Sequence, residues 1–311
     1  MSAQVRVLRQ RVKAVRSTQK TTKAMEMIAT SRIAKAQAKV AAAAPYAKQI
    51  TEVLTALASA SNLDHPLLTE RETPKRAGIL LITSDRGLCG GYNANAIKVA
   101  EELGALLRSE GKEPVMYVIG RKGLGYYTFR KRPVVASWTG FSEKPTYADA
   151  ERASDALLPA FTVGSEGTVE DGTPGIDEMH LVSTHFRSMI TQTARARRLA
   201  PMEVEIVEHD YSHPGAEMLP AYEFEPSVDA LLDEMLPKYV RTRIYAALLD
   251  SAASESAARR AACKSATDNA NDIIRNLSRQ ANQARQAQIT QELTEIVGGA
   301  DALAAIGTEE D

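Results

Sequence analysis

Apolar residues recur at spacings of three and four along the N-terminal segment 1–62, which contains one proline and no glycine. A heptad repeat sustained over this length is typical of a coiled coil, in which each helix buries its apolar stripe against a partner. The pattern therefore predicts one long helix over 1–62. The first seam position of the heptad holds Val5, Val12, Gln19, Glu26, Ile33, Val40, Ala47 and Leu54. The second seam position, three residues further on, holds Leu8, Val15, Thr22, Ala29, Ala36, Ala43, Ile50 and Leu57.

The apolar stripe turns polar at Gln19, Thr22 and Glu26. A polar residue at a seam position lowers stability but can fix the register of two helices. The same pattern is typical of a stretch of rod that faces another protein instead of its partner helix. The sequence leaves both interpretations open.

A second long helix is predicted over 226–300. No glycine or proline interrupts positions 238–297, and alanines dominate the first half, so a second helix axis can approach closely. Gly298 and Gly299 predict the end of this helix, with a frayed acidic tail over 301–311. Because neither helix can bury its stripe alone, we expect the two to pair antiparallel.

Short apolar runs alternate with amphipathic stretches through the middle segment 75–225. This alternation favours a largely parallel sheet with right-handed crossovers. A glycine-rich, acidic stretch over 164–178 is predicted as an exposed flexible loop. The predicted fold class is α+β overall, a long antiparallel coiled coil with a central Rossmann-like α/β domain. The predicted strands are 77–84, 114–120, 133–138, 178–184 and 203–207, and the predicted helices are 93–110, 147–161 and 187–199.

Charge is distributed unevenly, although the 311-residue chain has a net charge of only −1. The first sixty residues carry eleven lysines and arginines against two acidic residues, Glu26 and Glu52. Such a basic rod binds acidic surfaces, either nucleic acid or another protein. The rod lacks interleaved aromatic residues, and its expected partner helix carries nine acidic residues, so the sequence favours a protein surface.

The strongest candidate for a ligand site is the loop SDRGLCGGYN over 84–93, between a predicted strand and a predicted helix. A glycine-rich loop at this place can bind phosphate through backbone N–H groups. However, its glycines follow neither the dinucleotide-binding nor the P-loop spacing. A tight structural turn built on Asp85, Gly87, Gly90 and Gly91 is therefore favoured.

Other residues with useful chemistry do not form a recognisable site. His209 and His213 are four positions apart, but a metal site requires a further ligand at a defined spacing. Cys89 and Cys263 lack such spacing and are expected to be free thiols in a reducing compartment. No apolar run reaches the length of a membrane span. We expect no catalytic, cofactor or metal site in this chain, and membrane association only through partners.

Several stretches resemble the γ subunits of F-type ATP synthases, in the order in which that family carries them. They are STQKTTKAMEMIATSRIAKAQ (17–37), SDRGLCGGYN (84–93), ATDNANDIIRNL (266–277) and NQARQAQITQELTEIVGGA (282–300). The resemblance implies a bacterial rotary central stalk. Its coiled coil would stand inside a ring of α and β subunits, and its α/β domain would contact the ε subunit and the membrane c-ring.

The resemblance also implies a non-catalytic role, with one copy of the chain in each complex. The chain would couple proton flow through the c-ring to ATP synthesis on the β subunits, or ATP hydrolysis to proton pumping, and would regulate ATPase activity. ATP, ADP and Mg²⁺ would be bound by the α and β subunits, with no cofactor on this chain. The expected location is the cytoplasmic face of the cell membrane, peripheral and through the complex. The alternative is a basic coiled-coil protein that binds nucleic acid.

Carried onto this sequence, the family's pattern implies a set of contacts to the β subunits. Met25 would face the acidic lever of β, although it could instead be plain helix core, and the other residues could be ordinary exposed side chains. Two features depart from the family: Cys263 stands where methionine is usual, and 164–178 resembles an insertion found in only some γ subunits. The implied contact residues are Lys20, Lys23, Met25, Arg259, Arg285, Gln286 and Thr290.

Overall fold

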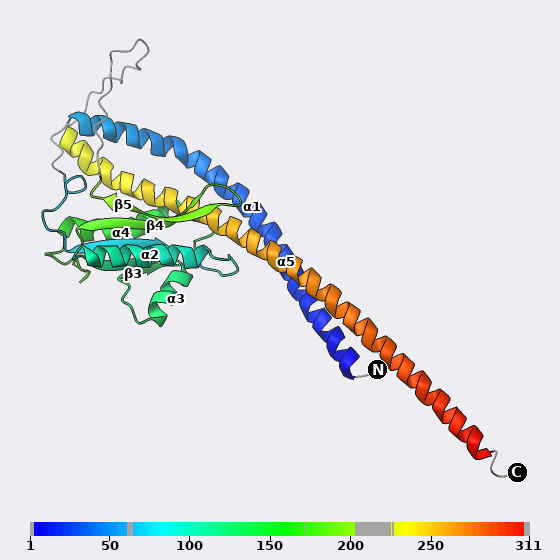
Figure 1. Ribbon diagram of the computed structural model, residues 1–311. Helices are drawn as coiled ribbons and strands as arrows, with labels where there is room; N and C mark the ends of the chain where they lie inside the picture. The colour runs from blue at the N-terminus through cyan, green and yellow to red at the C-terminus, as the bar shows by residue number, and fades with distance from the viewer. Residues whose placement is uncertain (1–2, 61–64, 171, 203–224, 226, 308–311) are drawn as a thin grey trace. The chain divides into compact units, whose positions relative to one another are not determined.

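Two long helices, α1 (Ala3–Ala60) and α5 (Val228–Gly307), open and close the described chain (Figure 1). The computed structural model describes residues 3–60, 65–170, 172–202, 225 and 227–307. The chain divides into two compact units, and each long helix contributes to both. The coil unit is Met1–Ile28 with Arg260–Asp311, and the foot unit is Ala29–Arg259.

Within the coil unit, α1 and α5 pack antiparallel. The side-chain amide of Gln19 donates to Asn271 Oδ1 at 2.5 Å, and the hydroxyl oxygens of Thr22 and Thr267 lie 2.7 Å apart. Residue numbers rise on one helix as they fall on the other, which confirms the antiparallel pairing predicted from the two stripes. The buried residues at this seam include Val5, Val12, Thr22, Cys263, Thr267, Ala270 and Ala281.

The polar part of the seam faces the partner helix, at least at Gln19 and Thr22. Each threonine hydroxyl also lies within hydrogen-bonding distance of a carbonyl of its own helix, Thr22 of Gln19 at 3.0 Å and Thr267 of Cys263 at 2.9 Å, so one threonine donates to the other and the second donates to its own carbonyl. These buried hydroxyls therefore have partners, as buried polar groups require. Their pairing favours the interpretation that the polar seam positions fix the register of the two helices.

The predicted end of the C-terminal helix at Gly298 and Gly299 is wrong, because α5 continues to Gly307. The predicted frayed tail is accordingly helical over 301–307. A glycine inside a helix costs about 1 kcal/mol relative to alanine but does not forbid the helical conformation. A C-terminal cap also needs a left-handed backbone, and neither glycine has a positive φ.

The foot unit contains a five-stranded sheet in the order β3-β2-β1-β4-β5. β1, β2, β3 and β4 are parallel, and β5 runs antiparallel to β4. The strands are β1 (Arg76–Ile82), β2 (Glu113–Ile119), β3 (Ala136–Trp138), β4 (Glu178–Phe186) and β5 (Gln192–Ala200), and the helices between them are α2 (Tyr92–Ser109), α3 (Arg121–Phe129) and α4 (Tyr147–Val163).

Helices cover both faces of this sheet (Figure 1). Successive side chains of a strand point to opposite faces, so β1 contributes to two cores. Ile79 and Leu81 pack with α2 and α3, whereas Leu80 and Ile82 pack with α1, α4 and α5. Because both faces are buried, β1 reads as a continuous apolar run in the sequence.

The segment 187–199, predicted as a helix, instead forms the turn after β4 and nearly all of β5. Arginine and alanine have high helix propensity, but Thr193–Arg197 alternates them with period two, which is the strand pattern. Helix α3 was not predicted, since its nine residues are too few for a clear helical period. The predicted strand 203–207 lies outside the described residues.

Gly120 provides a test of the packing between β1 and β2. Its φ is +98°, and a Cβ added there would lie 2.3 Å from the carbonyl oxygen of Thr83. We expect Gly120→Ala to lower the free energy of unfolding by at least about 2 kcal/mol, because a left-handed backbone and a backbone overlap both oppose the methyl group. Trp138, whose carbonyl accepts the Gly120 N–H at 2.8 Å, can report urea unfolding by its fluorescence.

Gly125 is the matched control, because it lies in α3 with no heavy atom within 4 Å of an added Cβ. Gly125→Ala should leave the unfolding midpoint unchanged or raise the free energy of unfolding by up to about 1 kcal/mol. Equal midpoints for the two variants would contradict the assigned close approach of Gly120 to Thr83.

Candidate functional site

The glycine-rich loop predicted as a possible ligand site connects β1 to α2. It lies at the carboxyl end of β1, where the chain order of the sheet reverses between β1 and β4. In open α/β sheets this switch point is the usual place for a bound ligand. The residues of this loop and its neighbours therefore decide whether the foot unit offers a ligand site.

Asp85 holds the loop to two neighbouring segments. Its carboxylate accepts backbone N–H groups of Arg121 at 3.2 Å, Gly140 at 2.8 Å and Ser142 at 3.1 Å. Gly90 has a φ of +56° and Gly91 is the N-cap residue of α2. The loop is thus a turn that joins β1 to α2 and ties both to the first residue of α3 and to the segment before α4.

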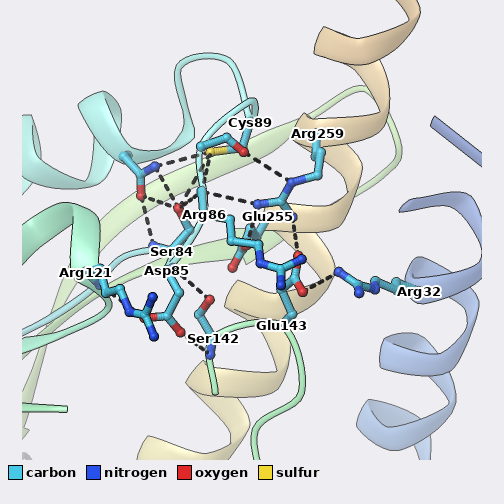
Figure 2. Close-up of polar contacts among 12 residues, drawn as sticks. Arg32, Ser84, Asp85, Arg86, Cys89, Arg121, Ser142, Glu143, Glu255 and Arg259 are labelled. Carbon is cyan, nitrogen blue, oxygen red and sulfur yellow. Dashed lines mark hydrogen bonds and ion pairs between the residues drawn. The ribbon is translucent and has the colours of Figure 1, made fainter. Parts of the chain in front are cut away.

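Arg259 of α5 contacts this loop through its guanidinium. Its guanidinium donates to the carbonyl oxygens of Gly87 and Arg86, each at 3.3 Å (Figure 2). A phosphate loop presents backbone N–H groups to an anion. This loop presents carbonyl oxygens to a cation, so its polarity is opposite to that of a phosphate site.

Two carboxylates surround Arg259 and connect it to α1. Glu255, one turn earlier on α5, contacts its guanidinium at 2.6 Å, and Glu143, in the loop before α4, contacts it at 3.2 Å. Glu143 also forms an ion pair with Arg32 of α1 (Figure 2). We name these four residues, Arg32, Glu143, Glu255 and Arg259, the anchor cluster. Within the foot unit, the cluster joins both long helices to the α/β domain.

The anchor cluster is largely withdrawn from water. The exposed fraction of the side chain is 1% for Glu255, 7% for Arg259, 15% for Glu143 and 25% for Arg32. Burial raises the pKa of the Glu255 carboxyl, although Arg259 beside it favours the ionised form. Burial also opposes the charge on Arg259, but Glu255 keeps the pKa of Arg259 above its ordinary value. Two acids and two bases make the cluster neutral when all four are ionised.

Both cysteines are free, as predicted, and both are buried. Burial raises the pKa of the Cys89 thiol, and its sulfur lies 3.2 Å from Asn93 Nδ2. A thiol with a raised pKa is a poor nucleophile. Cys89 therefore has a structural role in the turn and is not a reactive residue. Among the described residues, no three His, Cys, Asp or Glu side chains gather as a possible metal site. His209 and His213 lie outside the described residues.

The residues that the resemblance assigned to β-subunit contacts fall into two groups. In the coil unit, Lys20 and Lys23 of α1 are exposed and Met25 is half-buried. Lys23 forms an ion pair with Glu26 at 3.0 Å. On α5, the side chains of Arg285, Gln286 and Thr290 are exposed.

Arg259 differs from the other expected contact residues, because its side chain is buried in the anchor cluster. A guanidinium held by two carboxylates and two carbonyls is not available to another protein, so its expected role as a partner contact is corrected to an internal one. The spacing of Glu255 and Arg259, four apart on a helix, could have indicated their pairing. No sequence signal connects them to Glu143 or Arg32, which are distant along the chain.

Two further surfaces of the coil unit are exposed. On α5, Ala281 is the last buried residue among those described up to position 300. Beyond it, four large apolar side chains are exposed by 49–68%: Ile289, Leu293, Ile296 and Val297. On α1, all the basic residues of this unit are exposed, namely Arg6, Arg9, Arg11, Lys13, Arg16, Lys20 and Lys23.

Glu143→Gln tests the anchor cluster, because Glu143 alone contacts both arginines. Removing its charge leaves Arg32 and Arg259 with one carboxylate between them in a poorly solvated place. We expect the free energy of unfolding of the foot unit to fall by about 2–4 kcal/mol. The measurement is urea unfolding followed by the fluorescence of Trp138.

Glu52→Gln is the control for that experiment. Glu52 also lies in the foot unit and pairs with Lys48 at 3.5 Å, but its side chain is 53% exposed. Its loss should change the free energy of unfolding by less than about 0.5 kcal/mol, as for most surface ion pairs. If the two variants unfold at the same urea concentration, the anchor cluster does not stabilise the foot unit.

Comparisons with known proteins agree with the resemblance seen in the sequence. A family profile described as ATP synthase matches residues 4–303. The ATP synthase gamma chain of Saccharopolyspora erythraea is 60% identical over 311 residues, covering 99% of this chain and 100% of the relative. That of Mycolicibacterium smegmatis is 59% identical, covering 98% of this chain and 99% of the relative.

A solved structure agrees at the level of the fold. A chain in the cryo-EM structure of the Euglena gracilis mitochondrial ATP synthase (OSCP/F1/c-ring) has a TM-score of 0.65 at 15% identity, covering 97% of this chain and 95% of that chain. The family profile matches nearly the whole chain. The alignments with the two relatives, at about 60% identity, cover nearly the whole length of this chain and of each relative. The chain therefore belongs to the family of ATP synthase gamma chains.

Proposed function

We propose that this chain is the central rotating shaft of a bacterial ATP synthase. It couples proton flow through a c-ring to ATP synthesis on the β subunits, or ATP hydrolysis to proton pumping. The observation that carries the proposal is that α1 and α5 belong to both units. Torque applied to the foot unit then passes along two continuous helices into the coil unit.

Such a shaft must resist twisting and sliding of its two helices. In the coil unit, the helices are held by an apolar seam and by the contacts between Gln19 and Asn271 and between Thr22 and Thr267. In the foot unit, the anchor cluster fixes both helices to the α/β domain. A single helix would lack both restraints, because its stability depends on packing against a partner.

The shaft acts on catalytic neighbours by binding their conformations unequally. To shift one β subunit from 1:99 to 99:1 requires about 5.5 kcal/mol of differential contact energy. An asymmetric two-helix rod presents a different face to each of its neighbours, which supplies that difference. The nucleotide chemistry, with ATP, ADP and Mg²⁺, belongs to the α and β subunits, and this chain carries no cofactor.

The proposed contacts to the β subunits lie in the coil unit. Lys20, Lys23 and Met25 form the α1 contact, which meets an acidic surface of β. Arg285, Gln286 and Thr290 form the α5 contact, and Gln286 and Thr290 share one helix face because they are four apart. The exposed basic residues of α1 support this proposal, since oppositely charged surfaces steer association and weaken with salt.

The foot unit is proposed to contact the ε subunit and the c-ring, with one copy of the chain in each complex. In the described part of the chain, no helix is long and apolar enough to cross a membrane. We propose that membrane association, at the cytoplasmic face, comes through the c-ring. The nucleic-acid alternative has no support from the family to which the chain belongs.

The decisive experiment is direct observation of rotation. Ser109→Cys places an exposed thiol at the end of α2, and the buried Cys89 and Cys263 are shielded from the same label. A bead on that thiol, in a complex whose α and β subunits are fixed to glass, should turn in one direction when ATP is added. A bead that only fluctuates, with ATP hydrolysis continuing, would refute the role of a shaft.

Met25→Lys tests the proposed α1 contact. An added positive charge should hold the acidic surface of β too tightly and lower the number of protons pumped for each ATP hydrolysed in membrane vesicles. We expect the number of protons pumped for each ATP to fall by a factor of about two to five, which corresponds to one exposed ion pair of about 0.5–1 kcal/mol. The decrease should be larger at low salt, where screening is weaker.

Met27→Lys is the matched control. It introduces the same charge two residues away, at a side chain that is 60% exposed. Residues two apart do not share a helix face, so the coupling ratio of this variant should stay close to that of the wild type. Normal coupling in the Met25→Lys vesicles would remove Met25 from the proposed contact.

A further inference from the structure

A cavity interrupts the helix seam inside the foot unit. It has a volume of about 680 Å³ and lies among α1, α4 and α5. Seam residues of α1 on either side of it, Ile33 and Ile50, are 2–3% exposed. Between them, Val40, Ala43 and Ala47 are only half-buried, although they occupy the same heptad seam.

Short side chains explain the opening. Val40, Ala43 and Ala47 recur at helical spacing on one face of α1, and Ala246 stands on the α5 wall of the cavity. Alanine methyl groups do not reach across a space of this size, and a packed interior has few voids larger than a water molecule. The volume lies instead within the range of about 300–1,000 Å³ found for small-molecule sites.

Three tyrosines give the cavity its aromatic character. Tyr46 comes from α1, Tyr147 from α4 and Tyr245 from α5. The rings of Tyr147 and Tyr245 meet edge to face, with centroids 5.7 Å apart and planes at 74°. Tyr46 and Tyr147 remain 52% and 38% exposed. Such rings offer flat, rigid surfaces on which another aromatic ring can stack.

The charged groups at the rim each have a polar partner within the chain. Lys238 pairs with Glu234 at 2.6 Å, and Arg241 pairs with Asp155 at 2.8 Å and with Glu151 at 3.6 Å. Asp250 contacts His185 at 2.6 Å. An ionic ligand would have to displace one of these contacts, whereas a neutral ligand would not.

We propose that this cavity is a binding site for a neutral, flat aromatic molecule, of about two or three rings. Such a molecule would bury its faces against the alanines and tyrosines and would fill the gap between α1 and α5. The site does not depend on rotation, so its test and the test of the proposed shaft can fail independently.

The test uses the full-length chain and N-phenyl-1-naphthylamine, a neutral probe whose fluorescence rises in apolar surroundings. The wild type should show saturable enhancement. Ala43→Phe, which fills the cavity from α1, should weaken binding at least about tenfold. Ala42→Phe is the control, because Ala42 is exposed and does not line the cavity, and its affinity should stay within about twofold of the wild type.

A second variant separates loss of the site from loss of the fold. Ala246→Phe fills the same cavity from α5 and should weaken binding to a similar degree, while circular dichroism confirms unchanged helix content. If Ala43→Phe loses helix content, Ala246→Phe decides the question alone. Absence of saturable binding to the wild type, or equal binding by the wild type and a folded Ala246→Phe variant, would overturn the proposal.

Two comparisons test the assigned ligand chemistry and the accessibility of the site. The anionic analogue 8-anilinonaphthalene-1-sulfonate should bind more weakly than the neutral probe, and tighter binding would overturn the assignment of a neutral ligand. The complex with α and β subunits should bind the neutral probe as the free chain does. Loss of binding there would show that a neighbouring protein fills the cavity, and would overturn a small-molecule site.

Discussion

An apolar stripe along one helix stays in contact with water unless a second helix covers it, and this constraint governs both ends of the chain. α1 and α5 are separated by the entire α/β domain in sequence, yet each supplies the surface that the other needs. Their pairing in the coil unit buries small and β-branched residues rather than large ones. The stability of that unit therefore rests on close approach of two backbones, and substitutions that widen the seam act on both helices.

The foot unit has the topology of a doubly wound sheet, but a side chain of its own helix α5 contacts the loop at the switch point. In a nucleotide-binding relative of this architecture, backbone N–H groups after the first strand meet a phosphate. Here the corresponding loop turns its carbonyls toward Arg259, and Glu255 and Glu143 neutralise the guanidinium. A place that other folds use for a ligand has become the attachment point of a helix.

Much of this arrangement could be predicted from the sequence, because it follows from periodicity. The two long helices, their antiparallel pairing and most strands of the central sheet depend on patterns that extend over many residues. Predictions failed where the local signal was weak or ambiguous. The high helix propensity of alanine and arginine predicts a helix before Leu199 where their alternation forms a strand, and Gly298 and Gly299 predict a helix end where the backbone remains helical.

The site was less predictable than the fold, for a physical reason. Gly90 and Gly91 could be assigned to a turn, because turn residues act on their own backbone, whereas the distant N–H groups that Asp85 accepts could not be foreseen. The contacts of Glu143 with Arg32 and Arg259 join positions that only the folded chain brings together. The partial exposure of Val40, Ala43 and Ala47 could not be predicted from the sequence either, because a heptad pattern does not specify how far apart two helix axes lie.

The paired threonines of the coil unit have a consequence for the protons they carry. Thr22 and Thr267 take part in three hydrogen bonds, one to each other and one to a carbonyl of each helix. A hydroxyl group has a single proton to give, so two protons serve three acceptors. One of the three contacts therefore lacks a proton in each arrangement, and either threonine can be the one that donates to the other helix, because the two hydroxyls have the same choice of acceptors.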